Sequence, residues 1–198
     1  MSDSEENDPL GRVPSVEHQE QIHGMFDIDE ELARPTDEGS IAHAVIATLA
    51  ARTRNPTFGE MSAQVNAALG RFAPIEGRAH RQNILGVVGN YFRHCLPPAR
   101  FIFCGAEHDL GIGRADLIWI DISGYILVDE IKTGSPRSLR LTCTAEQVER
   151  YRAACVAAWA EMFVGLRLLC VSDPDASMFI LPNGGTLPLS STLLQHWS

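Results

Sequence analysis

The chain has 198 residues, 45% of them apolar and 21% charged, which indicates one globular domain with some additional chain. No apolar run reaches the roughly 18–20 residues of a membrane helix, and the N-terminal residues lack the basic and apolar regions of a signal peptide. A net charge of −9 excludes a simple basic nucleic-acid-binding module. We therefore expect a cytoplasmic protein with no membrane partner.

The charge is divided unevenly along the chain. Residues 1–39 contain 12 acidic residues against two basic ones, which gives this segment a charge of −10. Residues 40–198 contain 14 basic and 13 acidic residues, so the body of the protein is nearly neutral. Among all 16 basic residues, 15 are arginines and the single lysine is Lys132.

The N-terminal segment is predicted to be an acidic, largely disordered arm over residues 1–39. Residues 1–15 combine acidic side chains with two prolines and a glycine, and few of their side chains are apolar. Residues 16–33 also fit a weak amphipathic helix that docks on the body or on a partner protein. We favour a solvated arm that is available to a protein partner, and we expect the folded domain to span residues 40–198.

Apolar periodicity and turn signals predict an α/β fold in which a central mixed β-sheet is flanked by helices. The predicted helices span residues 40–53, 59–71, 74–94 and 144–163. The predicted strands span residues 100–105, 115–122, 124–132, 166–172 and 177–182, and a short helix is predicted after Pro188. Ser123-Gly124 is a tight-turn signal that makes the second and third strands a hairpin.

The five cysteines are widely spaced, without a C-x-x-C pair, at positions 95, 104, 143, 155 and 170. This spacing indicates neither a zinc knuckle nor a disulfide framework. Most of the cysteines adjoin apolar residues, so we expect buried free thiols in a reducing cytosol.

Asp116, Glu130 and Lys132 form the group with the clearest chemistry. Asp116 opens the first hairpin strand after a glycine-rich bend, and the hairpin can return Glu130 beside it. Residues at i and i+2 of a strand point to the same face, so Glu130 and Lys132 project together. Carboxylate oxygens suit Mg²⁺, and an adjacent amine can orient or deprotonate a water or offset charge in a transition state.

The lone lysine points to the same site independently of the spacing. This chain uses arginine for every other basic residue, which suggests that Lys132 occupies a site where arginine cannot replace it. An ammonium group can lose its proton when its environment lowers its pKa, whereas a guanidinium group cannot. A chance position at a strand end is the competing explanation. We favour a functional Lys132.

Asp116 followed by Glu130-Ile131-Lys132, on an order of helix, three strands, helix and strand, resembles the PD-(D/E)XK nuclease superfamily. The resemblance covers about residues 74–182. It implies a restriction-endonuclease-like core of order α-β-β-β-α-β(-β). It also implies Mg²⁺ as the cofactor, or Mn²⁺ in its place, bound by Asp116, Glu130 and the carbonyl of Ile131.

The next predicted helix carries Gln147 and Tyr151, whose Q-x-x-x-Y spacing is similar to the RecB-type branch of this superfamily, as is the segment VDEIKTG at 128–134. The two side chains share one helical face, and the resemblance implies that they position substrate. Gln147 also fits a capping box with Thr144, and Tyr151 also fits a core residue with its hydroxyl at the rim.

RecB-type enzymes often carry a further metal-proximal His or Glu in a G-x-x-x-H setting on the helix before the first strand. Gly77 precedes His80 by one residue too few for this motif, and Glu76 lies on the same helical face as His80. Both stay open as ligands, with a core histidine as the alternative for His80. Glu107 is a further carboxylate candidate.

Some members of the superfamily bind an iron–sulfur cluster through four cysteines, with a close group of cysteines after the nuclease core. Cys170 is the last cysteine of this chain and has no such group near it. We therefore expect no iron–sulfur cluster.

The resemblance implies a metal-dependent nuclease that hydrolyses phosphodiester bonds in nucleic acid, with DNA as the expected substrate, from an end or internally. Arginines near the motifs suit phosphate contacts, which position a strand without reading its sequence, although an ion-paired solvated face explains them equally. A non-catalytic subunit that binds nucleic acid or protein is the competing function. A sequence-specific restriction endonuclease is a third, although the chain shows no separate recognition domain.

Overall fold

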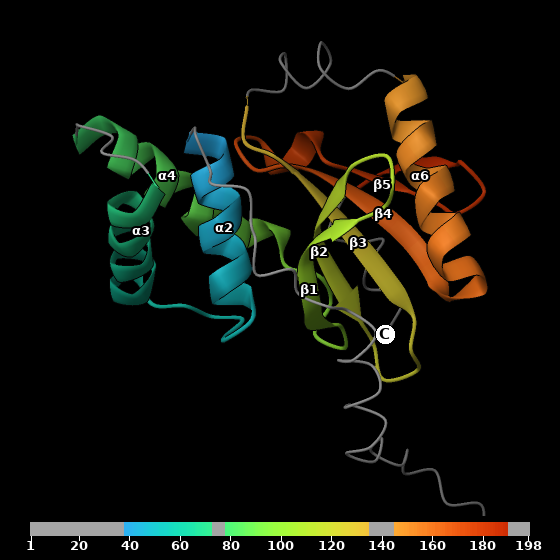
Figure 1. The fold of residues 1–198 in the computed structure, drawn as a ribbon, viewed down its shortest axis with the longest axis horizontal. Coiled ribbons are helices and arrows are strands. Elements are labelled where there is room, and N and C mark those ends of the chain that lie inside the picture. Colours follow the sequence, from blue (N-terminus) through green and yellow to red (C-terminus); the bar gives the residue numbers. More distant parts are fainter. Residues whose placement is uncertain (1–37, 73–77, 135–144, 190–198) are drawn as a thin grey trace, which may run out of the picture.

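The computed structural model describes residues 38–72, 78–134 and 145–189 (Figure 1). Most of the predicted acidic arm lies outside these ranges, as do residues 190–198, where a short helix is predicted. No helix within the described ranges is long and apolar enough to cross a membrane.

Helices precede and interrupt a single sheet. The α-helices of the described ranges are α2 (Glu38–Ala50), α3 (Phe58–Phe72), α4 (Arg78–Asn90) and α6 (Ala145–Trp159). The strands are β1 (Ile102–Asp109), β2 (Arg114–Ile120), β3 (Ile126–Lys132), β4 (Phe163–Cys170), β5 (Met178–Ile180) and β6 (Thr186–Pro188). A π-helical turn, Tyr91–Cys95, continues α4 toward the proline pair that ends it.

The six strands lie in the order β1 to β6 within one sheet. Neighbouring strands are antiparallel except for β3 and β4, which are parallel. Parallel neighbours need a crossover connection, and α6 lies between these two strands in the chain. The predicted α/β fold with a mixed sheet flanked by helices is therefore confirmed.

Helices cover both faces of the sheet, with α2, α3 and α4 on one side and α6 on the other (Figure 1). Each face has its own apolar core. Along β2, Leu117 and Trp119 belong to the core under α2–α4, whereas Ile118 and Ile120 belong to the core under α6. This period of two is that of a strand, and burial on both faces explains the nearly continuous apolar runs of β2 and β3.

The observed elements differ from the predicted ones mainly at the edges of the sheet. β1 begins at Ile102 and continues to Asp109, further along the chain than the predicted strand at 100–105. β6 was not predicted, because a three-residue strand that ends in proline has no periodicity to detect. Residues of α2, α3 and α4 share one core, so the folded body includes residues well before position 74.

Four of the five cysteines lie within the described ranges, and Cys143 lies outside them. Cys95, Cys104, Cys155 and Cys170 are all buried and free. Burial raises the pKa of Cys95 and Cys104 to about 11 and that of Cys155 to about 12. These three thiols are therefore protonated at neutral pH and behave as small core residues.

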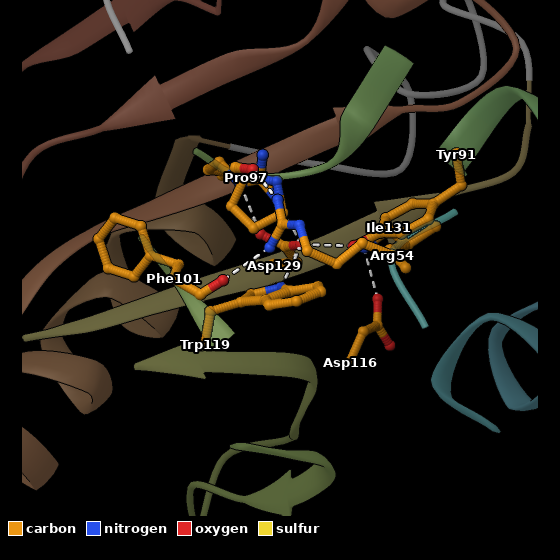
Figure 2. A network of polar contacts seen from close by, with 9 residues as sticks. Arg54, Tyr91, Pro97, Phe101, Asp116, Trp119, Asp129 and Ile131 are labelled. Carbon is orange, nitrogen blue, oxygen red and sulfur yellow. Dashed lines mark hydrogen bonds and ion pairs between the residues drawn. The ribbon is translucent and has the colours of Figure 1, made fainter. Parts of the chain in front are cut away.

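Asp129 in β3 is the centre of a buried polar network in which Tyr91 and Trp119 converge on its carboxylate (Figure 2). Arg167 in β4 donates two hydrogen bonds to this carboxylate, at 2.7 and 2.6 Å. The indole nitrogen of Trp119 donates at 2.8 Å and the hydroxyl of Tyr91 at 3.0 Å. A fully buried carboxylate is tolerated only with such partners, so the network fixes β2, β3 and β4 against the end of α4.

Removing the charge at the centre of this network should destabilise the fold. We expect Asp129→Asn to lower the free energy of unfolding by about 3–5 kcal/mol, because Arg167 is left as an unpaired buried cation. Urea denaturation followed by circular dichroism measures the change. Glu149→Gln is the control, since it removes the partner of Arg152 from an exposed ion pair and should have a much smaller effect. Equal midpoints for the two variants would contradict the structural role of Asp129.

Candidate metal centre

The site begins where β2 and β3 separate. The paired residues of these strands run from Ile120–Ile126 to Leu117–Asp129. Beyond that pair, the side chain of Asp116 replaces the backbone as the acceptor, and its Oδ2 receives the N–H of Ile131 at 2.5 Å (Figure 2). One acidic side chain from each strand, the buried Asp116 and the half-buried Glu130, therefore lies where the backbone pairing ends.

A histidine from α2 and a glutamate from β1 complete a cluster around Asp116. His43 Nδ1 lies 3.2 Å from Asp116 Oδ1. Glu107 lies between the β1–β2 pairs Ala106–Leu117 and His108–Ala115, which places it opposite Asp116. One ligand atom from each of His43, Glu107 and Asp116 lies within 4.8 Å of the others. Two carboxylates and an imidazole at this separation are suited to a divalent cation.

The backbone at Glu107 adopts a conformation that side chains other than glycine rarely take. Its φ is 54°, in the left-handed region, although the residue lies inside a strand. Such a conformation costs about 1–3 kcal/mol and persists only where the surrounding structure imposes it. The strain accompanies the placement of the Glu107 carboxylate beside Asp116.

The carboxylates of this cluster repel one another in a partly buried position. Burial, followed by the charge of Asp116, raises the pKa of Glu130 and of Glu107. Burial alone would lower the pKa of His43, but the hydrogen bond to Asp116 and the three nearby negative charges outweigh burial and raise it. The site therefore has an excess of negative charge, which a bound cation would relieve.

A pocket of about 220 Å³ adjoins the cluster on the α6 side of the sheet. Glu130 and Lys132 line it from β3, and the Lys132 ammonium donates to Glu130 Oε1 at 2.6 Å. Gln147 and Tyr151 line it from α6. Burial raises the pKa of Tyr151, so its hydroxyl stays protonated, and it donates to the carbonyl of Arg114. The pocket thus combines the carboxylate of Glu130 with amine, amide and hydroxyl groups.

Five of the predicted site residues meet here: Asp116, Glu130, Lys132, Gln147 and Tyr151. Glu107 lies with Asp116 in the cluster that could hold a metal ion, and the N–H of Ile131 donates to Asp116. A metal-binding role for the carbonyl of Ile131 stays a prediction.

His80 and Glu76 were the helical candidates for a further ligand. His80 lies on α4, and its Nδ1 contacts the carboxylate of Glu38 at the start of α2. Among the described residues, the cluster that could hold a metal ion contains His43 and not His80. Glu76 lies outside the described residues.

Sequence reasoning missed His43, although a signal was present. Gly39-Ser40-Ile41-Ala42-His43 has the G-x-x-x-H spacing that Gly77 and His80 lack by one residue. The resemblance places this motif on the helix directly before the first strand, which is where His80 lies. The same spacing occurs instead on α2. In the chain, α3 and α4 separate this helix from the sheet, but α2 packs directly against β1 and β2.

Comparison with known proteins gives no family for this chain: neither a protein-family model nor a curated protein matches it. The chemistry of the site is therefore argued from its own residues. The donor set fits a hard divalent cation, because oxygen ligands predominate and a single imidazole accompanies them.

Binding of Mn²⁺ should depend on His43 and Asp116. We expect Mn²⁺ to raise the melting temperature of the wild-type protein, since a ligand at 100 times its dissociation constant stabilises the folded state by about 2.7 kcal/mol. His43→Ala and Asp116→Asn should weaken Mn²⁺ binding about tenfold or more, measured by calorimetry. His80→Ala is the matched control and should bind Mn²⁺ as the wild type does. Equal losses in His43→Ala and His80→Ala would argue against the cluster.

Proposed function

We propose that the protein is a divalent-metal-dependent nuclease that hydrolyses phosphodiester bonds of DNA, related to the RecB-type branch of the PD-(D/E)XK superfamily. The observation that carries the proposal is the convergence of His43, Asp116, Glu130 and Lys132 at one opening of the sheet. His43 comes from α2, which is distant in sequence from β2 and β3, the strands that carry the other three residues. A carboxylate cluster with an amine beside it has the composition that metal-assisted phosphodiester hydrolysis requires.

The topology supports the same proposal. Three antiparallel strands are followed by α6 and by a strand parallel to the third. This arrangement supports the order α-β-β-β-α-β that we propose for a restriction-endonuclease-like core. The additional strands β5 and β6 extend the sheet beyond this unit. A fold alone does not fix an activity, so the side chains carry the functional argument.

Asp116, Glu107 and His43 would hold the cation, with Glu130 beside them as a further ligand and Mg²⁺ or Mn²⁺ as the ions that fit. A bound divalent ion offsets charge on the phosphate and lowers the pKa of its bound water. The chain itself keeps this site ready: Ile131 donates to one oxygen of Asp116, and His43 lies against the other. Asp116 is thereby held in one orientation before any ligand arrives.

Lys132 acts next to the cluster. Its ammonium group is held by Glu130 at 2.6 Å and faces the pocket. From there it can orient the attacking water, or donate to the negative charge that develops on the phosphate oxygens. An arginine would present a rigid fork that stays protonated, which fits the retention of one lysine in an otherwise lysine-free chain.

Gln147 and Arg150 offer neutral and positive donors along the α6 wall of the pocket. Such donors suit the phosphate and sugar oxygens of a nucleic-acid strand, and contacts of this kind position a strand without reading its sequence. The nearly neutral body predicts modest affinity without metal, since counterion release scales with the number of phosphates that are neutralised.

Cleavage assays test the proposal directly. Linear and circular DNA and RNA are incubated with the protein and Mg²⁺ or Mn²⁺. We expect metal-dependent cleavage of DNA that is abolished by chelation, and a loss of about 10²–10⁴-fold in rate for Lys132→Ala. Lys132→Arg should not restore the rate, because a guanidinium keeps its protons.

The controls separate catalysis from folding and binding. His80→Ala should cleave at the wild-type rate, and circular dichroism should show that each variant is folded. Cleavage by Lys132→Ala at the wild-type rate, or no cleavage of any substrate by the wild type, would refute the nuclease proposal. Tight metal-independent binding without cleavage would identify a binding subunit instead.

A further inference from the structure

The turn between β1 and β2 carries an isoleucine at the edge of the candidate active site. Ile112 is 56% exposed, yet it lines the same pocket as Glu130 and Lys132. A large apolar side chain that is mostly exposed contributes little to folding. Because Ile112 lies beside an amine and a carboxylate, contact with a bound ligand explains its exposed position better than folding does.

The turn that presents Ile112 is held in one conformation. The N–H of Leu110 donates to the carbonyl of Gly113 at 2.8 Å, which closes the turn around Ile112. The N–H of Gly111 donates to the side chain of Asp109 at 2.7 Å. Gly111 has a φ of 77°, a conformation that favours glycine. These bonds restrict the turn and so limit the entropy that Ile112 would lose on contact with a ligand.

Tyr151 joins this turn to the catalytic side of the pocket. Its hydroxyl donates to the carbonyl of Arg114, directly after the turn. Its ring lies 3.5 Å from the position that a Cβ on Gly113 would take, an ordinary van der Waals separation, so the turn packs against α6. Ile112 is therefore positioned relative to Glu130, Lys132 and Gln147 by a defined set of contacts.

The size of the pocket limits what can occupy it. Its volume of about 220 Å³ is below the range of about 300–1,000 Å³ typical of sites for drug-sized ligands. A double helix does not fit within such a pocket, whereas one nucleotide unit of a strand is of suitable scale. Four apolar residues line the pocket, and Ile112 is the exposed one, since Leu166 and Leu168 are buried and Val148 is half-buried. Ile112 is therefore the apolar side chain most accessible to a base.

We propose that Ile112 is an apolar wedge that contacts the nucleobase next to the scissile phosphate, so that the substrate is a nucleotide that has left the duplex stack, in single-stranded DNA or at a frayed end. This proposal rests on the proposed nuclease function. Isoleucine is one of the side chains that proteins insert between base steps, and separating a step costs a few kcal/mol. A fixed apolar contact repays part of that cost and favours the separated base.

The wedge is tested with two oligonucleotide substrates of one sequence, a single strand and a blunt duplex. Wild type is compared with Ile112→Ser, with Ile112→Met as the conservative variant. Ile122→Ser is the matched control, since Ile122 is 74% exposed in the turn at the other end of β2. We expect Ile112→Ser to slow cleavage of the duplex end about tenfold more than cleavage of the single strand. Ile112→Met should restore most of the duplex rate.

A binding measurement accompanies the rates. Lys132→Ala protein, alone or combined with Ile112→Ser or with the control Ile122→Ser, is mixed with a duplex that carries 2-aminopurine beside its terminal phosphodiester. The fluorescence of this base rises when the base unstacks, and we expect the rise with Ile112 present and its loss in Ile112→Ser.

Each outcome decides one of the two proposals. If the wild type cuts DNA and Ile112→Ser matches Ile122→Ser on both substrates and in fluorescence, the wedge is refuted and the nuclease function stands. If the wild type cuts no nucleic acid, the nuclease function fails and the wedge fails with it.

Discussion

The hydrogen bond from the N–H of Ile131 to the carboxylate of Asp116 is the interaction on which the candidate site depends. At this bond the backbone pairing of β2 with β3 ends, and the carboxylate takes over as the acceptor for the buried N–H of Ile131. A buried N–H without an acceptor would destabilise the fold. Because one oxygen of Asp116 is used in this way, the other is directed toward His43. Asp116 therefore ends the pairing of β2 with β3, is held in one orientation by the bond from Ile131, and contacts both α2 and β3.

Two clusters of charge lie close together and are balanced differently. Asp129 is fully buried and is neutralised by Arg167, with Tyr91 and Trp119 as further donors. The cluster around Asp116 has more carboxylates than cations, and its pKa shifts reflect that excess. The neutralised cluster around Asp129 makes this part of the fold rigid. The cluster around Asp116 has too few cations, and a metal ion can supply the missing positive charge. The neighbouring residues Asp129 and Glu130 thus belong to different tasks on opposite faces of one strand.

The sheet and its helices were predictable because β2 and β3 are long apolar runs and the turn residues between elements are distinctive. The pairing of Asp116 with Glu130 and Lys132 followed from strand alternation and a hairpin. His43 could not be predicted in this way, because it lies on α2, far from β2 and β3 in the sequence. Tertiary packing decides which helix brings a side chain to Asp116. Glu107 could be named as a candidate, but its left-handed backbone depends on contacts that periodicity does not reveal.

The adjacency of Asp129 and Glu130 has a consequence for the register of the sheet. A slip of β3 by one residue would turn Glu130 inward toward Arg167 and Asp129 outward, since each residue of a strand changes face. The shorter carboxylate is the one matched to Arg167, Trp119 and Tyr91, so the slipped pairing would leave the buried cation poorly satisfied. The ion pair thus favours the alignment of β3 that also brings the candidate metal ligands Asp116 and Glu130 together.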